Sequence, residues 1–465
     1  MPLVRSVVTF LCLLLPVSIR AAGPVSYTVD EAVALANQRN PDIAIARKKL
    51  EAAKGGVIQA RAGLLPSVVS TGLLRKREHE TQSRLRDEDY GVNLRVVQNL
   101  YTGGAVTSQR AIAQLRLEKQ ELELKAVSNK VAMDVRVACN ELLLNRAKVR
   151  VLQQSVDVLE QEARNQQERL RAGLAGQLNV HRAQVAAATS KAEVIDTQTQ
   201  LNTSSLKVVE LLGQDVNPNA AAPAIDITGQ LQYAYIRPDI NSCLARADTA
   251  RPEILSLQKD VEIEKWQERL DRSENRPQVE AFSGYEVYNE RDPAIAPEFQ
   301  HGYVVGLNAR WHIFDGFATK GRVIATRARR EAAEQAVAAM RASVASEVRG
   351  AFLDLEQADR LLQSETRTVQ TADESLEIAK ANVEAGFGTQ LDILQAAADV
   401  TKSRTVRLNG IYLHNIALAK LARACATSPD ALGFAAQRQA QAAGEERKGP
   451  AVSEMAQPPK KLTQR

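Results

Sequence analysis

The sequence carries the same pattern twice, at a nearly constant spacing. Two stretches each contain Ala-Gly, an apolar residue, a short polar or small run, and then Gln-Leu followed by Asn or Asp. Their equivalent leucines, Leu178 and Leu391, lie 213 positions apart, and the same offset relates Tyr101 to Phe314 upstream. A spacing held over so long a span indicates an internal duplication.

The Ala-Gly stretches lie between helical patterns. Gly173 and Gly386 follow long amphipathic runs, and another helical run begins a few residues later. Glycine adopts the left-handed backbone that ends many helices without a Cβ penalty. Each stretch is therefore predicted to be the tight tip of an antiparallel helical hairpin. A surface loop without a role is the alternative, and two matching tips disfavour it.

The runs before the tips predict two very long helices, over residues 105–172 and 318–385. The first would be on the order of 100 Å long. Its seam positions recur in alternating steps of four and three, and ten of the twelve are apolar, as in a coiled coil. The second helix repeats this seam at the 213 offset. The twelve seam positions are Val131, Val135, Ala138, Leu142, Asn145, Val149, Leu152, Val156, Leu159, Ala163, Gln166 and Leu170.

Two pairs of strands precede the long helices. In the last strand, alternate residues from Tyr303 to Ile313 are apolar, and those between them are mostly polar. This alternation is typical of a membrane barrel strand with a wet interior, and each run is long enough to cross a bilayer at about 9–11 residues. A soluble sheet with one face on a core is the alternative. The predicted strands are 67–76, 90–100, 279–288 and 302–314.

These patterns divide the chain. The start resembles a secretory signal, because Arg5 precedes an apolar run that is too short to span a membrane. The end is rich in Ala, Gln, Glu, Lys and Pro without periodicity, which predicts a disordered tail. The predicted parts are a signal peptide (1–22), a first repeat (23–213), a linker (214–239), a second repeat (240–426) and the tail (427–465).

Composition and motifs argue against catalysis. The five histidines are scattered without metal-ligand spacing, and neither a Gly-rich phosphate loop nor a nucleophile elbow occurs. No enzyme, cofactor or metal site is therefore expected. The net charge of +5 is too modest to indicate nucleic acid binding without a recognition motif.

The exported chain keeps three cysteines, Cys139, Cys243 and Cys425. An odd number with wide spacing indicates neither a disulfide framework nor a metal cluster. Cys139 corresponds to Phe352 in the second repeat, so a small buried apolar role is expected for it.

Four strands cannot close a barrel, and an open sheet edge cannot lie in lipid. Bacterial barrels have at least eight strands, so several chains must contribute, and three chains supply twelve. The helical seams also need partners. The prediction is an α+β membrane protein: a homotrimer whose 12-stranded outer-membrane β-barrel is continuous with a long periplasmic α-helical barrel. An exported coiled-coil scaffold without channel activity is the alternative, but it leaves the alternating strands unexplained.

The order of these features resembles the TolC-type outer-membrane efflux factors, over residues 27 to 430. The resemblance implies a passive exit duct of a tripartite efflux pump or type I secretion system. An inner-membrane transporter would supply the energy, and a periplasmic adaptor would dock on the hairpin tips. Besides the two tips, the likeness is carried by Asn40-Pro41, Arg251-Pro252, Leu64-Leu65-Pro66-Ser67, Leu100-Tyr101-Thr102-Gly103-Gly104 and Trp311-His312-Ile313-Phe314-Asp315-Gly316.

In that family an acidic ring guards the periplasmic aperture near the second tip. Asp392 matches its first acidic position, the second position is Gln395, and the equivalent first-tip position is Asn179. The resemblance therefore implies one ring of three Asp392 carboxylates that selects for cations in the closed state. Alternatively, Asp392 is the N-cap of the returning helix, and both roles can coexist. Some members lock the closed state with an Arg where this chain has Gly388, so that lock is not expected here.

The turns themselves are candidates for adaptor contact. Leu174 and Phe387 are apolar residues at exposed turns, which fits a docking surface. Packing against the neighbouring hairpin is the alternative. The predicted contact residues are Arg171, Gly173, Leu174, Gly386 and Phe387.

Overall fold

The computed structural model describes residues 25–76, 87–214, 225–289, 294–295 and 299–428. The predicted secretory signal lies outside these residues, as does the predicted tail from residue 429 onward.

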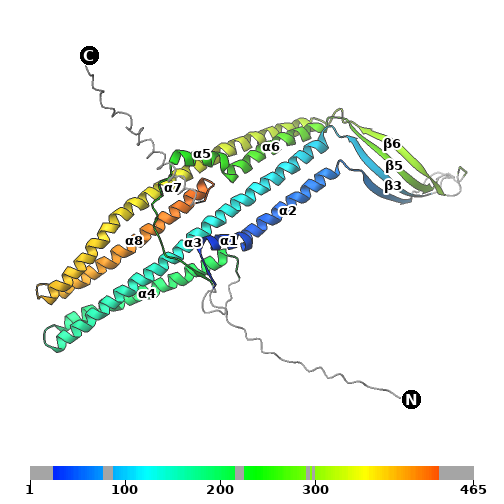
Figure 1. The fold of residues 1–465 in the computed structure, drawn as a ribbon. Coiled ribbons are helices and arrows are strands. Elements are labelled where there is room, and N and C mark those ends of the chain that lie inside the picture. The colour runs from blue at the N-terminus through cyan, green and yellow to red at the C-terminus, as the bar shows by residue number, and fades with distance from the viewer. Residues whose placement is uncertain (1–24, 77–86, 215–224, 290–293, 296–298, 429–465) are drawn as a thin grey trace, which may run out of the picture.

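Long helices make up most of the molecule, and a small sheet extends from one end of them (Figure 1). Among the described residues, no helix combines the length and the apolar character that crossing a membrane requires. The helices are α1 Val29–Arg39, α2 Pro41–Ala62, α3 Ala105–Arg171, α4 Gln177–Leu211, α5 Ile240–Ala250, α6 Pro252–Ser273, α7 Ala318–Glu384 and α8 Gln390–Ala424. The strands are β1 Val25–Tyr27, β2 Ser67–Lys76, β3 Glu88–Tyr101, β4 Ile225–Ile227, β5 Gln278–Asn289 and β6 Phe299–Arg310.

The element lengths confirm the internal duplication. α3 and α7 each have 67 residues, and α4 and α8 each have 35. The shorter helices match as well, with 11 residues in α1 and α5 and 22 in α2 and α6. Toward the tips, α8 packs between α7 and α3, and toward the sheet, α6 packs between α3 and α7.

Each repeat opens with a helix broken at an X-Pro step. Asn40 ends α1 and caps α2, and its Oδ1 accepts a hydrogen bond from Asp42 N at 2.9 Å. Arg251 holds the same place between α5 and α6. Proline is favoured at the first helical position, and the residue before it is pushed out of helical geometry. The helical stretch from Ile240 to Ser273 is therefore divided into α5 and α6.

The predicted seams are largely buried. Nine of the twelve seam positions of α3 are buried, whereas Val149 and Ala163 are half-buried and Leu170 is 37% exposed. Two buried clusters lie midway between the tips and the sheet, and we call them the first and second equatorial cores: in the first, α1 packs on α3 and α4, and in the second, α5 packs on α7 and α8. Each repeat therefore has its own equatorial core, far from the tips. A third cluster, which contains the seam residue Leu159 and residues of α4, α7 and α8, lies nearer the tips.

The sheet is antiparallel in the order β2-β3-β5-β6, and its register keeps apolar residues on one face. On that face Tyr303 and Val305 are 93% and 81% exposed. On the other face Arg95 pairs with Glu286 at 3.3 Å. This confirms the alternation expected of strands with lipid on one side and water on the other.

The last predicted strand is too long, because β6 ends at Arg310 rather than Phe314. Arg310 pairs with Gln278, the first residue of β5. The residue before it, Pro277, has no N–H and cannot extend the ladder. Trp311 instead donates its Nε1–H to Asn275 O at 3.1 Å as the chain turns toward α7.

A short parallel pair was not expected from the sequence. β1 pairs with β4 in register, from Val25 with Ile225 to Tyr27 with Ile227. Three residues are too few to show an alternating pattern, so the pair could not be recognised from periodicity. It ties the start of the first repeat to the segment between the repeats.

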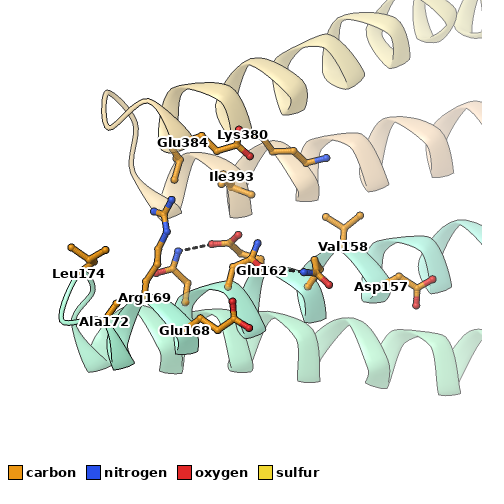
Figure 2. A pocket seen from close by; sticks show the side chains of 14 residues that line it. Asp157, Val158, Glu162, Glu168, Arg169, Ala172, Leu174, Lys380, Glu384 and Ile393 are labelled. Carbon is orange, nitrogen blue, oxygen red and sulfur yellow. Dashed lines mark hydrogen bonds between the residues drawn. The ribbon is translucent and has the colours of Figure 1, made fainter.

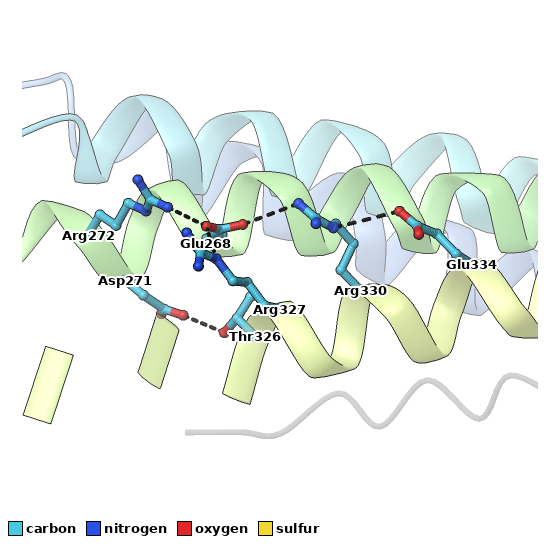
Figure 3. Close-up of polar contacts among 7 residues, drawn as sticks. All are labelled: Glu268, Asp271, Arg272, Thr326, Arg327, Arg330 and Glu334. Atoms are coloured by element: carbon cyan, nitrogen blue, oxygen red, sulfur yellow. Dashed lines mark hydrogen bonds and ion pairs between the residues drawn. The ribbon is translucent and has the colours of Figure 1, made fainter. Parts of the chain in front are cut away.

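An ionic cluster joins α6 to α7 near the sheet (Figure 3). The pKa of Glu268 is lowered, mainly by its hydrogen bond from Arg327. Beside it, Thr326 Oγ1 donates to Asp271 Oδ2 at 2.5 Å. The side chain of Glu268 is only 11% exposed, so its negative charge is stabilised by neighbouring arginines rather than by water. Its carboxylate contacts three arginines, at 2.6, 2.9 and 3.4 Å: Arg272, Arg327 and Arg330.

Candidate functional site: the two hairpin tips

The two hairpin tips lie at the same end of the molecule, opposite the sheet (Figure 1). Gly173 and Gly386 have φ of 74° and 81°, so both adopt the left-handed backbone predicted for them. In each tip the next residue, Leu174 or Phe387, donates its N–H at 2.8 Å to the carbonyl oxygen five residues earlier. This is the hydrogen bond that closes a Schellman motif.

The returning helices begin differently. α4 starts after Gly176, which has no side chain to cap it. α8 starts after Thr389, which forms a capping box with Asp392. Thr389 N and Oγ1 donate to Asp392 Oδ2 at 2.7 and 2.8 Å. These two bonds, the backbone one first, lower the pKa of Asp392 below its ordinary 3.8, so the carboxylate is ionised and held in place.

The N-cap of α8 is therefore Thr389, and Asp392 is its partner at the third helical position. The alternative that made Asp392 itself the N-cap is wrong. The Thr-x-x-Asp spacing was a usable signal for the capping box.

Asp392 and Gln395 lie together on the surface of α8. Both line an open groove of about 640 Å³ against α7, together with Asp399. Gln395 Nε2 donates to Asp399 Oδ1 at 3.2 Å. Asp399 was not singled out from the sequence, although its place seven residues after Asp392 puts both on one helix face.

Asn179, the third aperture candidate, lies on the other hairpin. Its backbone oxygen accepts a hydrogen bond from Gln390 Nε2 at 2.8 Å. Gln390 is 7% exposed, and its bond links the two hairpins at their tips. This role could not be predicted from the sequence, because the duplicated residue Gln177 is also a glutamine but is exposed.

A second cavity of about 770 Å³ opens between the two hairpins at this end. Figure 2 shows Arg169 extending from α3 and Glu384 and Lys380 from α7 toward this space. Leu174 lies at its rim, and Ile393 lines it from α8. Charged side chains such as Arg169, Lys380 and Glu384 line the cavity, and the apolar Leu174 lies at its rim.

The five residues predicted to contact a partner are all exposed: Arg171 ends α3, and the other four lie in the turns. Leu174 is 79% exposed and Phe387 is 89% exposed. Leu174 lines the cavity between the hairpins, whereas Arg171, Gly173, Gly386 and Phe387 do not. Two large apolar side chains so exposed at one end of the molecule are unusual for a surface without a partner.

Comparisons with known proteins agree with this architecture. The chain is 25% identical over 401 residues to protein CyaE of Bordetella pertussis, covering 85% of this chain and 83% of the relative. It is 22% identical to the cobalt-zinc-cadmium resistance protein CzcC of Cupriavidus metallidurans, covering 84% and 87%. The fold matches the outer membrane protein VceC of Vibrio cholerae with a TM-score of 0.71, at 18% identity and with 86% and 96% of the two chains covered.

A family model described as outer membrane efflux protein matches residues 32–214 and 244–427. Its two segments cover both long hairpins and both strand pairs. The chain therefore belongs to the outer membrane efflux protein family.

Proposed function

We propose that the tips form the closed periplasmic aperture of an exit duct, with one Asp392 from each copy of the chain in an acidic ring. The observation that carries this proposal is the ionised Asp392 carboxylate, fixed by Thr389 at the start of α8 and exposed on its surface. The exposed turns beside it form the surface on which the adaptor docks.

Family members form homotrimeric channels that work with periplasmic adaptor proteins and inner-membrane transporters. The chain is a passive duct rather than an enzyme, located in the outer membrane with a large periplasmic part. Of the described strands, β2 and β6 form the two edges of the sheet. Unpaired edges are not tolerated in lipid, which supports pairing with neighbouring copies into a barrel of twelve strands.

Three like charges around a narrow opening produce a negative potential that attracts cations and repels anions. Within the single chain, the hydrogen bonds from Thr389 lower the pKa of Asp392 below its ordinary value of 3.8 and so favour the charged form that the ring requires. Asn179 and Gln395 are neutral, so Asp392 supplies the charge among the three aperture candidates.

The test is ion selectivity of the closed channel in a planar bilayer. Asp392→Asn keeps an oxygen acceptor for Thr389 but removes the charge, so the ratio of cation to anion permeability should fall. Asn179→Ala, at the equivalent position of the first repeat, should leave the ratio unchanged. If Asp392 serves only as the capping partner of Thr389, the Asn variant will match the parent, and the proposed ring is wrong.

The proposed docking surface rests on the exposure of Leu174, at the rim of the cavity between the hairpins, and of Phe387 in the second turn. A photo-crosslinking residue at either position should capture the co-expressed adaptor. The control is the same residue at Ile195, which is 69% exposed but lies midway along α4. Crosslinks from the tips only to other copies of this chain would show that the turns pack against neighbouring hairpins instead.

A further inference from the structure

Two of the three exported cysteines meet in the second equatorial core. Cys243 lies in α5, and Cys425 is the residue that ends α8. They are 4% and 0% exposed and belong to the same buried cluster. Both are free thiols in the structure, and although they lie far apart in the sequence, they are near enough in this cluster for each to shift the pKa of the other.

The location of the protein gives this contact a chemical consequence. These cores belong to the helical part of the chain, which lies in the periplasm. The periplasm is an oxidising compartment in which adjacent thiols form disulfides. We propose that Cys243 and Cys425 are joined by a disulfide bond in the mature protein, which ties α5 to the end of α8.

The two thiols are not equivalent as reactants. The hydrogen bond from Cys425 lowers the pKa of Cys243, and the same contact raises the pKa of Cys425. Cys243 is therefore the better nucleophile, because the thiolate is the reactive form. Both sulfur atoms are buried in the folded chain, so the reaction takes place during folding, after α5 has met the end of α8 and before the core around the two thiols closes.

The oxidant is the disulfide of an exported thiol oxidoreductase. The Cys243 thiolate attacks one sulfur of that disulfide and forms a mixed disulfide. Cys425 then loses its proton and attacks Cys243 Sγ, which releases the oxidoreductase as its dithiol. The pair loses two electrons and two protons, and the oxidoreductase gains both.

The first repeat provides the internal comparison. The positions equivalent to Cys243 and Cys425 are Ala32 and Leu212, both fully buried in the first equatorial core. Cys139 lies in that core without exposure, and burial raises its pKa to about 12. Among the described residues, no cluster of three or more His, Cys, Asp or Glu is placed to hold a metal ion, so a disulfide is the reaction that fits the pair.

The experiment uses the full trimer purified from membranes, denatured and alkylated without a reductant, followed by peptide mass spectrometry. Cys139 should be alkylated. Cys243 and Cys425 should appear in one cross-linked peptide that lacks two hydrogen atoms and separates on reduction. Complete alkylation of Cys243 and Cys425 in the unreduced sample would overturn the proposal.

Variants separate the bond from the packing of the core. Cys243→Ser should make Cys425 fully alkylatable, and Cys139→Ser should leave the cross-linked peptide intact. Reduction should lower the apparent Tm of the parent and of Cys139→Ser, but not that of a Cys243→Ala/Cys425→Ala double variant. A cross-link of Cys425 to Cys139 in the parent would also contradict the assignment.

Discussion

The two repeats share a backbone and differ in their side chains at matched positions. At the tips, α4 begins after an uncapped Gly176, whereas α8 begins with the Thr389–Asp392 capping box. In the equatorial cores, the first repeat has Ala32 and Leu212 where the second has a pair of thiols. Near the sheet, Val57 occupies the position equivalent to Glu268.

The features that both repeats share are the apolar periodicity of the helices and the turn glycines, and these are sufficient to specify the common backbone. The capping box at a tip, the pair of thiols and the buried Glu268 cluster occur only in the second repeat of the described chain. α6 lies between α3 and α7, whereas α2 packs on α3 and α1. A buried charge such as Glu268 requires partners from more than one direction, and the second repeat supplies them.

The largest expected effect is at the ionic cluster. Glu268→Gln removes the charge that contacts three arginines, and we expect a loss of about 1–3 kcal/mol of unfolding free energy. Val57→Ala, at the equivalent place of the first repeat, should have a smaller effect. Denaturant unfolding followed by circular dichroism measures both. The control is Glu262→Gln, because that side chain is 49% exposed and pairs with Lys259 at 3.6 Å. Equal losses for Glu268→Gln and the control would contradict the comparison.

The contribution of Glu268 should also depend on pH. Its pKa in the folded protein lies below the ordinary value of 4.5. The stabilisation is therefore complete above that value and is lost as the pH falls through the lowered pKa. The difference in apparent Tm between the parent and Glu268→Gln should shrink below pH 4.5. A difference that stays constant on acidification would show that shape rather than charge holds the cluster together.

The turn glycines should behave alike in both repeats. A Cβ added at Gly173 or Gly386 meets no atom within 4 Å, so Ala is disfavoured there only by its left-handed backbone. That strain is about 1–2 kcal/mol, and amide hydrogen exchange at each tip should accelerate by about fivefold to thirtyfold. Gly176→Ala is the control, because its φ is −87°. Clearly unequal effects of the two substitutions would mean that the tips are not equivalent in backbone energetics.

The smallest effect is at the bond between the tips. Gln390→Ala removes the hydrogen bond to Asn179 O, which contributes about 1 kcal/mol, so exchange at the start of α8 should accelerate by about fivefold. Gln177→Ala changes the duplicated residue, which is exposed, and should leave exchange unchanged. Similar exchange in the two variants would remove Gln390 as the link between the hairpins.

Most of the architecture could be predicted from local patterns. The helix break at Asn40-Pro41, the left-handed backbone at Gly173 and Gly386, and the long helix from Ala105 each follow from a few neighbouring residues. Exposure of Leu174 and Phe387 followed from their place in a tight turn. At the site, the N-cap of α8 is Thr389 rather than Asp392, and the Thr-x-x-Asp spacing is the local pattern that predicts this arrangement.

By itself, the sequence determined the two repeats, the helical hairpins and the alternating strands, because periodicity and turn chemistry act over a few residues. Only the tertiary structure decided which of the two identical glutamines links the tips, where β6 stops, and that β1 pairs with β4. The same holds for the contact between Cys243 and Cys425. Each of these depends on side chains or backbone groups far apart in the sequence, and packing of the long helices brings them together.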